Sequence, residues 1–159
     1  GSANWDILAQ VKEALSIPFV ANGDIRTPED VDKALEVTGA DALMVGRAAL
    51  GNPWIIKQLT HYLATGQVLD QPSPSQIIET AKEHLRRLVN LKGQVVATKE
   101  FRKHASYYLK GFPGSAKAKV KVNEQTDPDK VIEILDAAGL AAEEKLAKRR
   151  ARRQARASR

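Results

Sequence analysis

Two short polar segments in the first third of the chain have residue types that can hold a phosphate group. Asn22-Gly23-Asp24 follows one apolar run, and Gly46-Arg47 follows the next. Because glycine has no Cβ, an anion can approach the backbone closely at these positions. The arginine adds a guanidinium that can bind phosphate oxygens through two donors at once. The pattern predicts a phosphate site built from Asn22, Gly23, Asp24, Gly46 and Arg47.

The elements that would position these segments alternate between helical and extended patterns. Helical apolar spacing occurs in residues 5–15, 28–38 and 53–63, and nearly continuous apolar runs at residues 17–21 and 41–45 predict buried strands. Strands that alternate with helices imply parallel crossovers, so both strand ends would lie at one edge. A TIM barrel binds phosphate at such an edge, after its last two strands. The same glycines could also serve only to turn the chain.

Two parallel strands cannot close a sheet, and both runs are apolar enough to require neighbours on either side. We therefore expect an α/β fold in which the first part of the chain is the last two βα units of a TIM (β/α)8 barrel, with the earlier strands outside these 159 residues. A connector rich in proline, glycine and polar residues, at 65–74, predicts a domain boundary. Gly1-Ser2 could be a cloning remnant or authentic sequence.

After the connector the apolar period becomes purely helical. The pattern predicts helices over residues 73–93, 96–109 and 128–138, the last of them capped by Asp127 and ended by Gly139. We expect an all-α domain that follows the barrel segment.

Charge and composition limit the possible functions. The net charge of +6 arises entirely in residues 141–159, where eight cations accompany two acids. Such a tail either contacts RNA or is a solvated helix that aids solubility. The absence of cysteine excludes disulfides, cysteine-based metal sites and a thiol proton donor within these residues. No metal site is proposed, and the lack of a long apolar run or signal sequence makes a cytoplasmic location, without a membrane span, the expectation.

A second candidate site lies in the helix predicted at residues 96–109. Cations and an aromatic ring recur there within successive turns, so that they can share one surface. Cations bind phosphate oxygens, and an aromatic ring can stack on an unpaired base. The candidate residues are Arg102, Lys103, His104, Tyr107 and Lys110. From the residues alone, a solvated helix face with a half-buried tyrosine is the more common explanation.

These segments also carry a family resemblance. Residues 17–25 and 39–54 are similar to the end of the barrel in flavin-dependent tRNA-dihydrouridine synthases, most closely the bacterial B-type members. Many flavin barrels share the Asn-Gly-Asp and Gly-Arg ends. The run Gly-Arg-Ala-Ala-Leu-Gly-Asn-Pro-Trp at residues 46–54 is typical of a narrower group of these proteins. The Arg-Lys-His and Tyr-Leu-Lys-Gly segments at 102–104 and 108–111 resemble the helical domain by which these enzymes hold tRNA. The resemblance covers about residues 3–140.

The resemblance implies a function and a division of the chain. In the family, reduced FMN gives hydride to C6 of a flipped-out uracil, a cysteine protonates C5, and NADPH regenerates the flavin. Residues 1–66 would then belong to the FMN-binding barrel and 67–140 would form the tRNA-binding domain. Residues 141–159 are a basic tail outside the resemblance, for which RNA contact and a solvated helix both stay open. No catalytic residue is expected here, since the catalytic cysteine belongs to earlier strands. We expect the isolated chain not to reduce uridine and to bind flavin weakly.

Two other functions fit the residues. The chain could be a non-catalytic RNA-binding module, in which case it would bind tRNA without flavin. It could also belong to another FMN TIM-barrel oxidoreductase, such as a dihydroorotate-type or dihydropyrimidine-type dehydrogenase, which would have no use for tRNA. The sequence does not indicate which uridine is modified, nor the oligomeric state.

Overall fold

The computed structural model describes residues 2–157, which divide into two compact units. The first unit ends at Gln71 and the second begins at Pro72. No helix within residues 2–157 combines the length and the apolar character that a membrane span requires.

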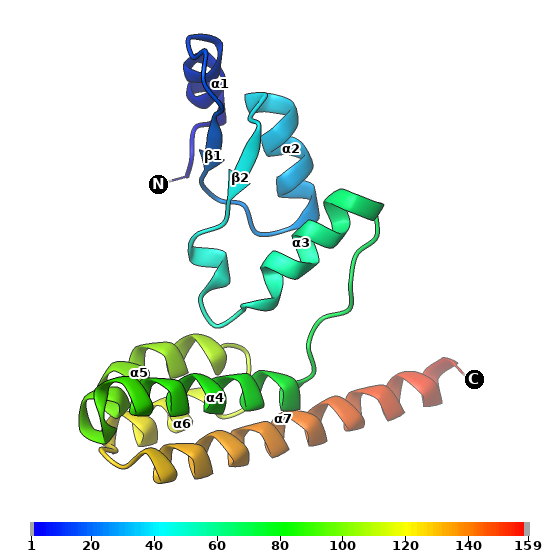
Figure 1. Cartoon of the computed structure of the whole chain (residues 1–159). Coiled ribbons are helices and arrows are strands. Elements are labelled where there is room, and N and C mark those ends of the chain that lie inside the picture. The colour runs from blue at the N-terminus through cyan, green and yellow to red at the C-terminus, as the bar shows by residue number, and fades with distance from the viewer. Residues whose placement is uncertain (1, 158–159) are drawn as a thin grey trace. The chain divides into compact units, whose positions relative to one another are not determined.

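The first unit alternates helices with two short strands (Figure 1). Its elements are α1 (Trp5–Glu13), β1 (Val20–Asn22), α2 (Pro28–Thr38), β2 (Ala42–Met44), the 3-10 helix η1 (Arg47–Ala49) and α3 (Trp54–Thr65). The strands pair in parallel, with Ala21 opposite Leu43 and Asn22 opposite Met44. The predicted alternation of helices and strands is therefore confirmed, as is their parallel pairing.

Local sequence signals account for the start and end of α2. Thr27 accepts from the amide of Asp30, whose carboxylate in turn accepts from the amide of Thr27, and this pair forms a capping box. Pro28 occupies the first turn, where no intrahelical donor is needed. Gly39, at φ 61°, ends the helix in the left-handed conformation. The buried face of α2 joins a small core with residues of the neighbouring elements, made of Ile25, Val31, Ala34, Ile55 and Leu59.

Within the described residues β1 and β2 are not covered on both faces, and the prediction places the neighbouring strands outside these 159 residues. Ala21 is buried, but Val20 and Met44 are 53% and 55% exposed. Side chains alternate between the faces of a strand, and in this two-stranded sheet only one face is covered. Both strands are also shorter than the apolar runs that predicted them.

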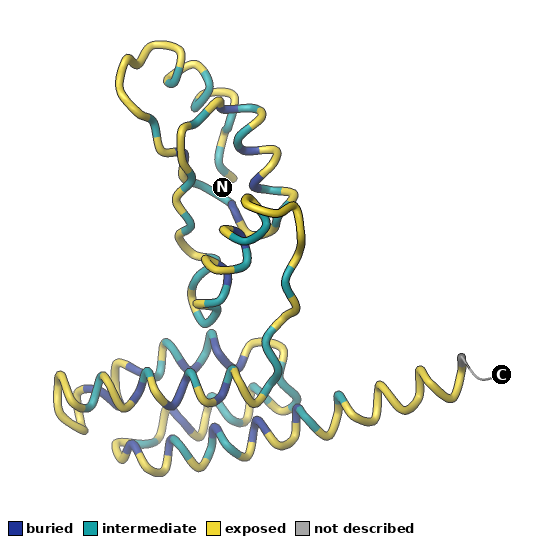
Figure 2. The backbone as a smooth tube through the Cα atoms, turned by 45° about the vertical axis from the view of Figure 1, so that its right-hand side comes forward, coloured by how far each residue is buried: buried dark blue, intermediate teal, exposed yellow. Residues whose placement is uncertain are grey.

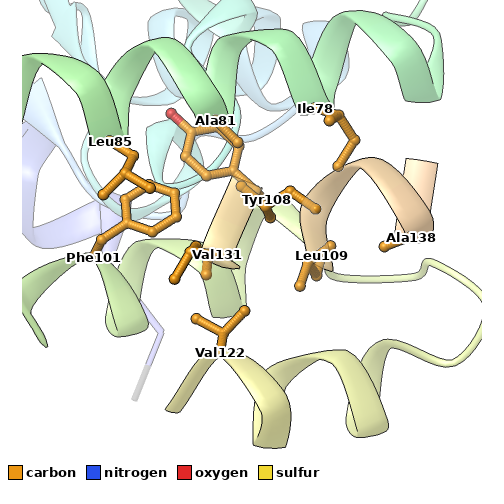
Figure 3. Close-up of a cluster of buried hydrophobic side chains, with 11 residues drawn as sticks. Ile78, Ala81, Leu85, Phe101, Tyr108, Leu109, Val122, Val131 and Ala138 are labelled. Atoms are coloured by element: carbon orange, nitrogen blue, oxygen red, sulfur yellow. The ribbon is translucent and has the colours of Figure 1, made fainter. Parts of the chain in front are cut away.

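The second unit consists of four helices around one core. They are α4 (Pro74–Lys92), α5 (Gln94–Tyr108), α6 (Ser115–Glu124) and α7 (Pro128–Ala157). Side chains from all four helices meet there, including the fully buried Leu85, Phe101, Val122 and Val131 (Figure 3). The three predicted helices are present, whereas α6 was not predicted. Only Val122 of α6 is buried, so the sequence of this helix has no clear apolar period.

The predicted helix end at Gly139 is wrong, because α7 continues through this residue to Ala157. Gly139 lies where α7 passes α4. A Cβ at this position would stand 2.9 Å from Cγ1 of Ile78, closer than real Cβ contacts. The glycine therefore allows two helices to approach, and it does not end α7.

Replacing Gly139 by alanine is expected to destabilise the chain by about 1–3 kcal/mol, although the same change in an exposed helix interior stabilises by about 1 kcal/mol. The new methyl group would force Ile78 from its position. Urea unfolding of Gly139→Ala, Ile78→Ala and the double variant measures the effect. The double variant should lose less than the sum of the single changes. Additive losses would show that the two residues do not compete for space.

Candidate functional site

The parallel pairing brings the two predicted phosphate-binding segments to the same edge of the sheet. β1 ends at Asn22 opposite Met44, the last residue of β2, so Gly23-Asp24 and Gly46-Arg47 leave the sheet side by side. They surround a concavity of about 300 Å³. Its lining includes all five residues predicted for this site, which are Asn22, Gly23, Asp24, Gly46 and Arg47.

Asp24 is the centre of the hydrogen bonding at this concavity. Its Oδ1 accepts from Nη2 of Arg26 at 2.7 Å and from Nη2 of Arg47 at 3.0 Å. Its Oδ2 accepts from the backbone amide of Ala3 at 2.8 Å. The Ala3 amide, followed by the Arg26 guanidinium, lowers the pKa of Asp24 below its ordinary value. Asp24 is therefore ionised at neutral pH and orients both arginines.

The two arginines give the concavity an excess of positive charge. Two guanidinium groups accompany one carboxylate, and the side chains of Arg26 and Arg47 are 60% and 74% exposed. Each guanidinium has five N–H donors, and the bond to Asp24 uses one of them. The remaining donors are suited to an anion such as phosphate. Sequence analysis did not identify Arg26, although its position two residues after Asp24 indicates that both could share a loop.

The two glycines have different surroundings. A Cβ on Gly23, whose φ is 134°, would lie 2.5 Å from the Cβ of Ala3. Glycine at 23 therefore accommodates the segment that precedes α1. A Cβ on Gly46 would make only an ordinary contact, 3.9 Å from Oδ1 of Asn22. Both glycines line the concavity, and of the two only Gly46 could carry a Cβ without a clash.

Trp5 holds the Gly23-Asp24 loop through a hydrogen bond to its backbone. Its Nε1 donates to the carbonyl oxygen of Gly23 at 3.1 Å, and its ring packs against the core of the first unit. Lys33 places its ammonium 5.8 Å from the ring centre, within the range of a cation–π interaction. Trp5 therefore helps to fix the Gly23-Asp24 turn, a role that the apolar pattern of α1 alone did not indicate.

On the second unit, three of the five predicted RNA-binding residues lie on the outer side of α5. Lys103 is exposed and Tyr107, one turn later, is half-buried. Lys110 is exposed in the turn that follows the helix. Lys99, one turn before Lys103, is also exposed and extends this set. We call Lys99, Lys103, Tyr107 and Lys110 the α5 face.

Arg102 lies apart from the α5 face, because consecutive residues of a helix are about 100° apart. Its Nη2 donates to the carbonyl oxygen of Gln125 at 3.0 Å, at the end of α6. Its Nε is buried, and no acceptor within the described residues reaches it. Arg102 thus links α5 to the end of α6.

His104 contacts α4. Its ring centroid lies 4.5 Å from that of His84 and 6.4 Å from that of Phe101. Nδ1 of His84 is in turn 3.3 Å from the hydroxyl of Tyr108. Burial lowers the pKa of both histidines, and a neighbouring basic group adds to this effect: the His104 ring for His84, and the Lys103 ammonium for His104. Both rings are therefore neutral at pH 7 and form part of the α4–α5 contact.

Comparison with known proteins gives a consistent result across both units. The family model described as dihydrouridine synthase (Dus) matches residues 1–145. A tRNA-dihydrouridine synthase B of Xanthomonas axonopodis pv. citri is 46% identical over 129 residues, which are 81% of this chain and 39% of that protein. A probable tRNA-dihydrouridine synthase of Rickettsia conorii is 41% identical over 128 residues, 80% of this chain and 39% of the relative.

A tRNA-dihydrouridine synthase B of Pseudomonas aeruginosa is 40% identical over 129 residues, with the same 39% of its length covered. The chain thus spans about two fifths of the length of the curated relatives that it matches. The match extends over the strand ends of the first unit and most of the second. The chain belongs to the dihydrouridine synthase family.

Proposed function

We propose that the chain supplies the FMN-phosphate site and the tRNA-binding domain of a flavin-dependent tRNA-dihydrouridine synthase, which reduces uridines in tRNA with FMN and NADPH. The observation that carries this proposal is the concavity in which Asp24 holds Arg26 and Arg47 beside Gly46. In the proposal the first unit belongs to the FMN-binding barrel. The second unit is the tRNA-binding domain. A tRNA substrate also supports a cytoplasmic location.

The chemistry of the concavity fits a phosphate monoester. Arg47 and Arg26 would bind its oxygens, and Asp24 would orient both guanidiniums. Gly46 would let the phosphate approach the backbone, and the amide of Asn22 adds a donor. FMN, when bound, supplies the hydride that reduces C6 of uracil. The residues of this chain would anchor and orient the cofactor.

The chemical step also needs a proton donor, which we place outside this chain. In the family that donor is a cysteine, and these 159 residues contain none. We therefore assign no catalytic residue here, and the isolated chain should not form dihydrouridine.

The α5 face supports the RNA-binding part of the proposal. Lys103 and Lys110 would bind phosphates, while Tyr107 offers a ring for stacking on a base. Arg102 and His104, which contact Gln125 and His84, would act by holding α5 in place. This division assigns direct RNA contact to three of the five residues that the sequence pattern indicated.

Comparison of FMN with riboflavin tests the phosphate site directly, since the two ligands differ only in the phosphate. We expect millimolar FMN to shift the backbone amide signals of Gly46 and Arg47 in heteronuclear NMR spectra of this chain. Riboflavin, at the concentration its solubility allows, should shift them much less than FMN at the same concentration. Arg47→Met should weaken the FMN response by about tenfold, which corresponds to the loss of one charge-assisted contact of about 1.4 kcal/mol.

Arg87→Met is a matched control for this experiment. Arg87 is 77% exposed and paired with Glu83, much as Arg47 is 74% exposed and paired with Asp24. The control should respond to FMN as the unmodified chain does. Equal responses to FMN and riboflavin would contradict the phosphate site. If tRNA still bound in that case, the non-catalytic RNA-binding module would be the better description.

A further inference from the structure

The second half of α7 extends past the helices that cover its first half. Val131, Leu135, Ala138 and Ala142 are buried in the core of the second unit. Glu143 still contacts α4, because its Oε1 accepts from the amide and hydroxyl of Ser75 at 3.0 and 2.8 Å. Every residue from 147 to 156 is exposed (Figure 2). This segment therefore has a regular backbone, and no element within residues 2–157 covers it.

The exposed segment is densely and uniformly charged. Residues 145–156 include seven cations and no acid, which are Lys145, Lys148, Arg149, Arg150, Arg152, Arg153 and Arg156. Four of them recur at the spacing i, i+4, i+7 and i+11. At about 100° per residue, they fall within about 60° of one another around the helix axis and span about 16 Å along it. We call Lys145, Arg149, Arg152 and Arg156 the α7 stripe.

Such a stripe has an electrostatic cost for the free protein. Like charges at i, i+4 destabilise a helix by about 0.2–0.5 kcal/mol per pair, and Arg149 has such neighbours at Lys145 and Arg153. The buried half of α7 nucleates the helix and offsets this repulsion. A row of anions along the stripe would remove the repulsion. The arrangement therefore fits a linear polyanion better than a single small anion.

We propose that the α7 stripe binds the phosphate backbone of RNA, as a contact additional to the α5 face. Arginine, which provides three of its four cations, binds phosphate oxygens through a planar pair of donors. A membrane surface fits less well, because residues 147–156 include no large apolar side chain, and the side of α7 away from the stripe has Arg150 and Gln154 beside the small Ala147 and Ala151. The family match ends at residue 145, so most of the stripe lies outside the matched region.

The inference rests on the proposed function only in the choice of tRNA as the probe. Binding of unmodified tRNA to the full 159-residue chain is measured by fluorescence anisotropy over a range of NaCl concentrations. The test variant is Arg149→Ala/Arg152→Ala/Arg156→Ala. Since each lost phosphate contact lowers the slope of log Kd against log salt by about 0.7–0.9, we expect the slope to fall by about 2–3. The affinity at low salt should weaken by on the order of tenfold or more.

A matched control removes the same charge from the same segment at positions outside the stripe, two of which flank it and one of which lies on the far side of the helix. Lys148→Ala/Arg150→Ala/Arg153→Ala should lower the slope by less than about 1. Circular dichroism should show equal helix content in both variants, because alanine favours the helix in each. Equal losses of slope in the two variants would overturn the proposal, because they would show only a general effect of charge. An unchanged slope in the test variant would also overturn the proposal.

Vesicles of phosphatidylserine and phosphatidylcholine provide the remaining comparison. Weaker binding to these vesicles than to tRNA is expected, and stronger binding that depends on Arg149, Arg152 and Arg156 would assign the stripe to a membrane surface instead. These variants leave Arg47 and its loop intact. A failure of the flavin-phosphate proposal is therefore seen in the FMN titration, and a failure of the stripe is seen in the salt slope.

Discussion

Replacing Phe101 by alanine is expected to lower the free energy of unfolding of the second unit by about 3–5 kcal/mol. Phe101 is fully buried in the four-helix core, beside Leu85 of α4 (Figure 3). Its ring also lies 5.7 Å from that of His84 and 6.4 Å from that of Tyr108. The loss is a large part of the 5–15 kcal/mol typical of a domain, and urea unfolding monitored by circular dichroism measures it.

Leu91→Ala serves as the control for this experiment. Leu91 is also a large apolar residue on a helix of the second unit, but it is 76% exposed. Its replacement should change the unfolding free energy by less than about 0.5 kcal/mol. A loss below about 1 kcal/mol in Phe101→Ala would contradict the four-helix core described here.

Acidification from pH 7 to pH 5 is expected to destabilise the second unit through His84 and His104. Burial lowers the pKa of each ring in the folded state below the ordinary value near 6.5. The unfolded chain then binds more protons than the folded chain in the window below 6.5, so the stability present above this pH is lost as the pH falls. The loss stops where the folded rings themselves become protonated.

The free energy of unfolding cannot change by more than about 1.4 kcal/mol per pH unit for each proton bound. Partial exposure of both rings reduces this slope further. Urea unfolding at several pH values measures this slope. The charged groups nearest the pair are Lys103, which disfavours protonation of His104, and Glu100, which favours it. His84→Gln/His104→Gln should flatten the dependence between pH 5 and 6.5. A double variant with an unchanged slope would assign the effect to other groups.

Local signals were sufficient for several elements of this fold. The capping boxes of α2 and α4 begin at Thr27 and Ser73, and each uses a side chain three residues later. Such contacts lie within one turn, so the sequence alone indicates where these helices start. The same is true of the adjacent strand ends, because parallel crossovers place Asn22 and Met44 at one edge.

Other features depend on residues that are distant in the sequence. Gly139 resembled a helix end because its partner, Ile78, is 61 positions away and no local pattern indicates it. The helix α6 was missed since only Val122 of its residues is buried, by contacts from the other helices. Arg102 was grouped with Lys103 by proximity along the chain, yet its guanidinium binds Gln125.

The amino-acid sequence by itself determined the α/β alternation of the first unit, the helical character of the second and the residue types at the edge of the sheet where we propose a phosphate site. It did so because capping, apolar period and strand order are short-range properties. Only the tertiary structure decided that Asp24 orients two arginines, that Gly23 faces Ala3, and that His104 contacts α4. These arrangements depend on which side chains meet across the fold, and that is set by packing.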